Sequence, residues 1–133
     1  MPRLIPIPLL VLFALGCGGT GGDAVPPETA EAVRQRIEQR IHLRNDTLRL
    51  ARPGTQDTVA LAFDHVHEEV RNTPGGRYVA CVDFTAPGGE VWDLDYYVDE
   101  AGEGYQVEDV VIHLVGEEEV LPEGARRRLE QAR

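Results

Sequence analysis

The chain has 133 residues, of which 42% are hydrophobic, and its formal net charge is −10. This length and apolar content provide for one modest core and leave no room for a second domain of ordinary size. The acidic balance argues against a nucleic-acid partner, because phosphate binding requires clustered cations.

The first sixteen residues have the composition of a secretion signal. Arg3 supplies a positive charge, residues 4–15 are apolar, and small residues follow them. An apolar run of about 12 residues is roughly 18 Å long as a helix, which is too short to cross a hydrocarbon layer of about 30 Å. We therefore expect residues 1–16 to be a signal peptide that is removed on export.

The sequence Ala14-Leu15-Gly16-Cys17 resembles the lipobox of bacterial lipoproteins, although Ala14 stands where the family usually has Leu. The resemblance implies that Cys17 is acylated through its sulfur and becomes the new N-terminus, and several acyl chains hold a protein firmly at a membrane. In that family an Asp after the cysteine resembles an inner-membrane retention signal, and this chain has Gly18 there. The expected location is the cell envelope, at the outer membrane rather than the inner one if the cell has both. The alternative is an ordinary secreted protein with a coincidental cysteine.

Residues 17–28 combine the lipid anchor with a flexible tether rich in Gly and Pro, so one folded domain is expected over residues 29–133. The first element of this domain is an amphipathic helix over residues 29–44. Polar residues separate four apolar ones that recur at spacings of three and four: Ala30, Val33, Ile37 and Ile41.

After Asp46 the pattern changes from helical to alternating, which is typical of β-strands joined by hairpins. Connections that contain Gly separate the strand-like runs at 47–51, 58–70, 76–85, 90–100 and 104–115. The predicted fold class is α+β, with one N-terminal helix packed on a four- to five-stranded antiparallel meander. The tail from residue 121 is expected either to add a short helix or to fray.

This order of elements resembles the cystatin-like and nuclear-transport-factor-like folds. The stretch from His65 to His113 also resembles small uncharacterised bacterial exported proteins in which HVH, DLD and IH recur. Neither resemblance implies catalytic residues, because fold alone does not determine function.

A three-residue loop at 87–89 fixes the expected pairing of the strands on either side of it. It gives the opposed pairs Phe84–Trp92, Asp83–Asp93 and Cys81–Asp95, and it places the apolar residues of both strands on one face. Continued through a loop at 101–103, the same pattern predicts Asp95 opposite Asp109 and Val91 opposite His113.

The other face of the sheet then carries candidate ligands for a divalent transition metal: His65, His67, Asp83, Asp93, Asp95 and His113. Histidines at i and i+2 of a strand project to one side, and neutral imidazole suits Zn or Cu. The two histidines share the parity of Leu61 and Phe63, so this interpretation requires a β-bulge near Asp64. The alternative is that the histidines pair with acidic neighbours on a solvated face.

Cys81 is interpreted as a small packed residue, with a reactive thiol or an intermolecular bond as the alternatives. Catalysis by Cys81 with His65 or His113 would need an oriented base and an oxyanion pocket, and we expect no enzyme. Most acidic residues lie between 57 and 119, whereas most arginines lie in the helix and the tail. The acidic face is therefore expected to be solvated, to receive the arginine-rich ends, or to recruit a basic partner.

Two functional classes follow. The first is a membrane-tethered module that binds a protein or small-ligand partner and needs no cofactor. The second is a divalent metal-binding protein that takes Zn or Cu on the strand histidines and aspartates.

Overall fold

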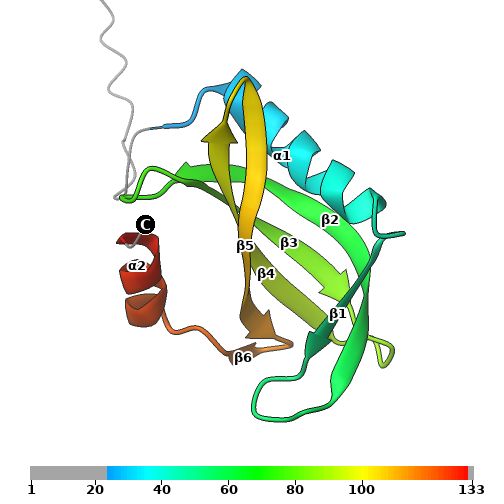
Figure 1. Ribbon diagram of the computed structural model, residues 1–133. Helices are drawn as coiled ribbons and strands as arrows, with labels where there is room; N and C mark the ends of the chain where they lie inside the picture. The colour runs from blue at the N-terminus through cyan, green and yellow to red at the C-terminus, as the bar shows by residue number, and fades with distance from the viewer. Residues whose placement is uncertain (1–23, 132–133) are drawn as a thin grey trace, which may run out of the picture.

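The computed structural model describes residues 24–131 as an α+β fold with two helices and one six-stranded antiparallel sheet (Figure 1). The strands lie side by side in chain order, as in a meander. The elements are α1 (Pro27–His42), β1 (Thr47–Ala51), β2 (Thr58–Asn72), β3 (Tyr78–Thr85), β4 (Val91–Ala101), β5 (Gly104–Val115), β6 (Glu118–Glu119) and α2 (Glu123–Gln131).

The predicted α+β class and antiparallel sheet are confirmed, but the predicted number of strands was wrong. The additional strand, β6, has two residues in a run of glutamates that lacks alternation, so no periodic pattern indicates it. The predicted signal peptide, Cys17 and most of the tether lie outside the described residues. Within residues 24–131, neither helix is both long enough and apolar enough to cross a bilayer.

Helix α1 begins at Pro27, where proline fits because the first turn has no use for its missing N–H. Its buried residues Val33, Ile37 and Ile41 form a stripe that packs on β2, β5 and β1. The chain leaves the helix through Asn45 and Asp46, both at φ 57°, a left-handed conformation that Asn and Asp tolerate better than most residues.

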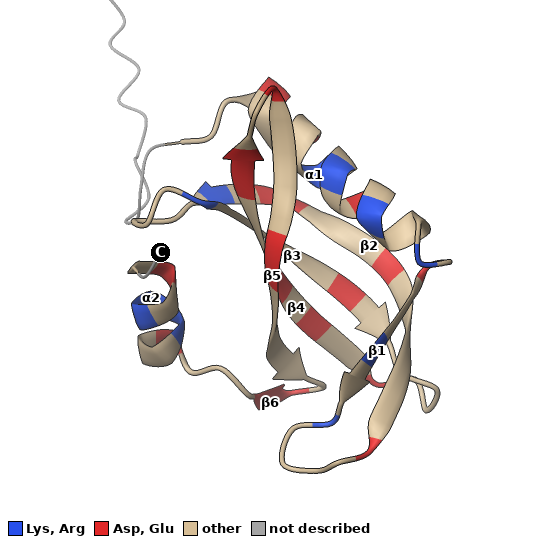
Figure 2. Cartoon of the chain, in the orientation of Figure 1, with Lys and Arg blue, Asp and Glu red and all other residues tan. Residues whose placement is uncertain are grey.

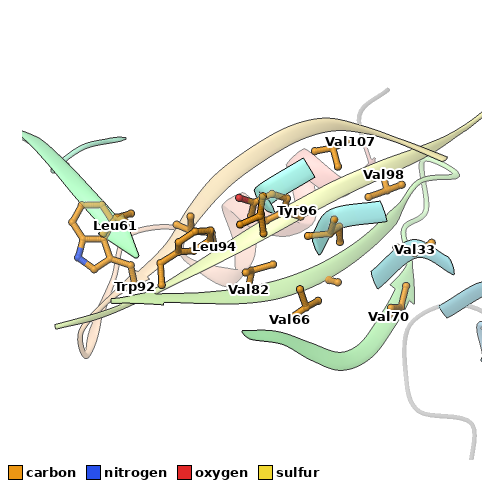
Figure 3. Close-up of a cluster of buried hydrophobic side chains, with 14 of the residues drawn as sticks. Val33, Leu61, Val66, Val70, Val82, Trp92, Leu94, Tyr96, Val98 and Val107 are labelled. Carbon is orange, nitrogen blue, oxygen red and sulfur yellow. The ribbon is translucent and has the colours of Figure 1, made fainter. Parts of the chain in front are cut away.

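The hydrophobic core lies between α1 and one face of the sheet (Figure 3). Val82 and Phe84 of β3 and Trp92 and Leu94 of β4 are fully buried there. They face each other as the sequence predicted, with Phe84 opposite Trp92 and Val82 opposite Leu94. Gly89, at φ 90°, closes the three-residue turn that sets this register.

The pairing of β4 with β5 differs from the prediction. Asp95 lies opposite Val111 rather than Asp109, and Val115 rather than Ile112 lies opposite Trp92. The hairpin turn is shorter than expected, with Ala101 opposite Gly104, and the register then shifts at two β-bulges. The extra residues of these bulges, Glu108 and His113, have no counterpart in an alternating pattern.

Strand β2 has the bulge near Asp64 that the metal interpretation of His65 and His67 required. Phe63 lies opposite Phe84 and His65 lies opposite Asp83, so Asp64 is the extra residue. A second irregularity follows between Val66 and Val70, and there Arg34 of α1 donates a hydrogen bond of 2.6 Å to the carbonyl oxygen of Glu68. Because Asp64 is an extra residue, the alternation of β2 changes face after Phe63, and His65 and His67 lie on the face opposite the apolar core.

Candidate functional site

Figure 2 shows acidic residues on the central strands of the sheet, and the register places Asp83, Asp93 and Asp95 on the face opposite α1. We call this surface the acidic face. Asp83 of β3 lies directly opposite Asp93 of β4, and the next inward pair joins Cys81 to Asp95. Like charges opposite each other destabilise a sheet unless a cation or a proton offsets them.

The first donor cluster on this face, called the open site, comprises His65, His67 and Asp83. His67 Nε2 lies 3.0 Å from Asp83 Oδ1, and His65 Nε2 lies 3.7 Å from Asp83 Oδ2. The two imidazoles stack with their centroids 5.2 Å apart and their planes within 7°. The side chain of His65 is 57% exposed, so solvent reaches the three donors without a change in the fold.

The second cluster, called the buried site, comprises Cys81, Asp93, Asp95 and His113. One donor atom from each residue lies within 4.8 Å of the others. Asp95 is fully buried and accepts a hydrogen bond of 3.3 Å from the Cys81 thiol. His113 reaches this point because it is the extra residue of the β5 bulge, and its Nδ1 lies 3.8 Å from Asp95 Oδ1.

Helix α2 brings a cation to the buried site. Arg126 Nη2 donates a hydrogen bond of 3.1 Å to Asp95 Oδ1 and lies 3.7 Å from Cys81 Sγ. Its Nε is 2.9 Å from Asp95 Oδ2, an ion-pair distance, but the geometry is not that of a hydrogen bond, and both atoms lack a hydrogen-bond partner. Figure 1 shows α2 on the opposite side of the sheet from α1.

The remaining contacts of α2 gather at its C-terminal end. Glu130 accepts a hydrogen bond of 3.0 Å from Arg71 of β2 and one of 3.4 Å from the hydroxyl group of Tyr97. Its carbonyl oxygen accepts a backbone hydrogen bond of 3.0 Å from Gly75. These polar contacts join α2 to the sheet, where Tyr97 and its cross-strand neighbour Val79 are also buried, and Glu130 is the buried residue of the helix.

Burial is the largest single influence on the pKa of each of these groups. It raises the pKa of the Cys81 thiol to about 12, with the negative charges of Asp95 and Asp93 as further causes. Burial, followed by the charge of Asp95, also raises the pKa of the Asp93 carboxyl group. For Arg126, burial opposes the charged form, but Asp95 and its neighbours outweigh this effect and the pKa is raised.

The six metal ligands that the sequence predicted fall into these two clusters rather than one. His65, His67 and Asp83 form the open site, whereas Asp93, Asp95 and His113 belong to the buried site. Sequence reasoning placed Cys81 opposite Asp95 but interpreted it as packing and did not include it among the ligands. It did not single out Arg126, although the contrast between an arginine-rich tail and an acidic sheet pointed to such a contact.

The cavities of the described part of the chain differ in character. The cavity between α1 and the sheet, beside Ile41, Phe84 and Tyr96, has a volume of about 60 Å³. That is about two water molecules' share of liquid volume, far below the ~300 Å³ of a small ligand pocket. A larger groove of about 540 Å³ lies at the far end of the sheet and is lined by acidic side chains, among them Asp99, Glu100, Glu108 and Asp109.

Comparisons of the chain with protein-family models, with curated proteins and with solved structures gave no match.

Proposed function

We propose that the chain is a cell-envelope protein, tethered to the membrane through a lipid on Cys17, that binds a divalent transition metal ion at the open site. The observation that supports metal binding is the convergence of His65, His67 and Asp83 after the bulge at Asp64. Two imidazole nitrogens and a carboxylate, held on rigid strands, make a three-ligand set that suits Zn or Cu. The proposal involves no catalytic residues.

The surroundings of the open site favour capture of an ion from solution. The two histidines are well exposed, whereas Asp83 is 20% exposed, so the carboxylate is anchored while the imidazoles can adjust. His65 Nδ1 lies 3.3 Å from Asp64 Oδ2, an outer carboxylate of the kind that orients metal-binding imidazoles. A three-ligand site of this kind leaves a coordination position open to water or to another molecule.

A second candidate function is that of a tethered module that binds a basic partner. The groove of about 540 Å³ supports it, because Arg77 is paired with Asp109 at 2.7 Å and the other charged side chains of the groove are acidic. The small size of the cavity under α1 favours this surface over the core as the place for a partner.

Zinc binding to the purified chain is expected to depend on His65 and His67. Replacing His67 with alanine removes one of three ligands and should weaken the affinity at least tenfold, since even outer-shell changes cost a metal site about 10- to 100-fold. Isothermal titration calorimetry measures this change. His42→Ala is the matched control, because His42 is half exposed and contacts Asp46 and Phe63, away from the open site. Equal affinities for His67→Ala and His42→Ala would reject the open site.

The lipid anchor is expected to appear in the mass of the exported chain. Intact mass spectrometry should show a product that begins at Cys17 and carries acyl groups. Cys17→Ser should lose the acyl mass, whereas Cys81→Ser should retain it, because the second thiol lies in β3 and far from the processing sequence. A product that keeps Met1, or one that begins at Cys17 without acyl mass, would contradict the tether.

A further inference from the structure

Several polar atoms of the buried site have no hydrogen-bond partner. Asp95 is 0% exposed, and its Oδ2 lies 2.9 Å from Arg126 Nε without the geometry of a hydrogen bond. Asp93 Oδ1 and His113 Nδ1 are also buried without a hydrogen bond. Donor atoms of two carboxylates, an imidazole and a thiol thus lie within 4.8 Å of one another, with Asp95 buried and the other three residues half-buried. Burying two carboxylates together costs free energy of folding unless a cation compensates their charge.

Arg126 supplies that cation only in part. Its guanidinium pairs with Asp95 and approaches Cys81. Its Nε atom still lacks a hydrogen bond, and so do the donor atoms of Asp93 and His113. A planar guanidinium suits the two oxygens of one carboxylate, whereas these donors converge on one point from two strands and a bulge. A compact ion fits that arrangement better.

The donor set indicates which ion would fit. Thiolate sulfur, imidazole nitrogen and two carboxylate oxygens make four ligands, the number and types found in tetrahedral zinc sites. One donor atom of each residue lies within 4.8 Å of the others, close enough for small side-chain movements to bring the four onto one ion. The carboxylate oxygens are hard donors and the thiolate sulfur is a soft one. Zinc and cobalt accept both kinds, whereas calcium and magnesium prefer oxygen ligands.

The attachment of α2 allows Arg126 to leave. The helix is held by Arg126, by the Glu130 contacts with Arg71 and Tyr97, and by one backbone bond from Gly75. The hydrophobic core lies on the other face of the sheet, under α1. Lifting the helix would therefore leave that core covered, although it would expose Tyr97, which is 0% exposed beside Glu130.

We propose that the buried site is a second, gated site for a divalent transition metal, in which Arg126 takes the place of the ion until the metal displaces it and releases α2. As the metal–sulfur bond forms, the Cys81 thiol gives its proton to solvent, and no oxidation or reduction takes place. The site shares no ligand with the open site, so it goes beyond the function proposed above.

Cobalt titration of the purified chain tests this proposal, because cobalt bound to a thiolate has a sulfur-to-metal charge-transfer band in the near ultraviolet. The open site has no sulfur and gives no such band. The band is expected in the wild type and absent in Cys81→Ser. Arg126→Gln removes the competing charge and should strengthen the binding that produces the band at least tenfold. Arg127→Gln is the matched control, since Arg127 is exposed and pairs with Glu123 in the same helix.

Release of α2 has its own measurement in the wild-type chain. Hydrogen exchange of residues 123–131 should become faster when cobalt saturates the band, whereas exchange in β3 and β4 should not. A band without faster exchange would overturn the gating by Arg126. Absence of the band in both the wild type and Arg126→Gln would overturn the buried site. If Arg126→Gln does not fold, absence of the band in the wild type alone would overturn it.

The two metal proposals fail separately. In a His65→Ala, His67→Ala double variant the band should persist, while the calorimetric zinc binding at the open site is lost. Zinc binding that depends on His67, without any band, would leave the open site standing and remove the buried site. The reverse result would remove the open site alone.

Discussion

Replacing Trp92 with alanine is expected to lower the free energy of unfolding by about 4 kcal/mol, within the range for truncating a large buried aromatic side chain. Trp92 is 0% exposed and lies opposite Phe84 in the core. Its Nε1 donates a hydrogen bond of 3.0 Å to Glu90, and the guanidinium of Arg52 lies 5.5 Å from the centre of its ring. The substitution removes the packing of the ring together with both polar contacts.

Urea denaturation followed by far-ultraviolet circular dichroism measures this loss, because the variant no longer contains the single tryptophan of the chain. Val91→Ala is the matched control. Val91 is the neighbouring residue of β4 and is 43% exposed, so its truncation should change the free energy by about 0.5 kcal/mol or less. Similar losses in the two variants would show that the face of β4 assigned to the core is wrong.

Replacing Arg126 with alanine is expected to cost about 3 kcal/mol, the low end of the range for breaking a buried ion pair. The carboxylate of Asp95 would then have no guanidinium beside it, although it is fully buried. The cost stays at the low end because α2 can lift away and let water reach Asp95. Hydrogen exchange should therefore become faster in α2 before the sheet is affected.

Two further variants separate charge from packing at this position. Arg127→Ala removes an exposed arginine from the same helix and should change the free energy of unfolding by about 0.5 kcal/mol or less. Adding Asp95→Asn to Arg126→Ala removes the unpaired buried charge, so the double variant should recover part of the loss. If the double variant had a lower free energy of unfolding than Arg126→Ala, the loss in Arg126→Ala would not come from the unpaired charge of Asp95.

Alternation and turn length were sufficient to predict the centre of the sheet. The loop at 87–89 fixed Phe84 opposite Trp92, as the structure has it. A bulge near Asp64 was needed only by the metal interpretation, since plain alternation would put His65 and His67 on the apolar side, and the structure has this bulge. The hairpin register follows from a local rule, since a one-residue slip would turn a whole apolar set outward.

The remainder of the candidate site depends on features without a local pattern. The bulges at Glu108 and His113 change the register of β5, and only the second brings His113 to Asp95. The contact between Arg126 and Asp95 joins residues 31 positions apart. Charge distribution left docking of the arginine-rich ends on the acidic strands as one of three alternatives, beside a solvated face and a basic partner, and it did not determine which arginine meets which carboxylate.

Arg71 connects the two ends of the described chain. Its backbone forms an isolated antiparallel bridge with Ala24, and its guanidinium holds Glu130. Tension on the segment before α1 would therefore reach the sheet through a single bridge at the last residues of β2. The bridge would break as one residue pair, before any of the six paired strands separates. The site would keep its shape under a pull that detaches only this corner.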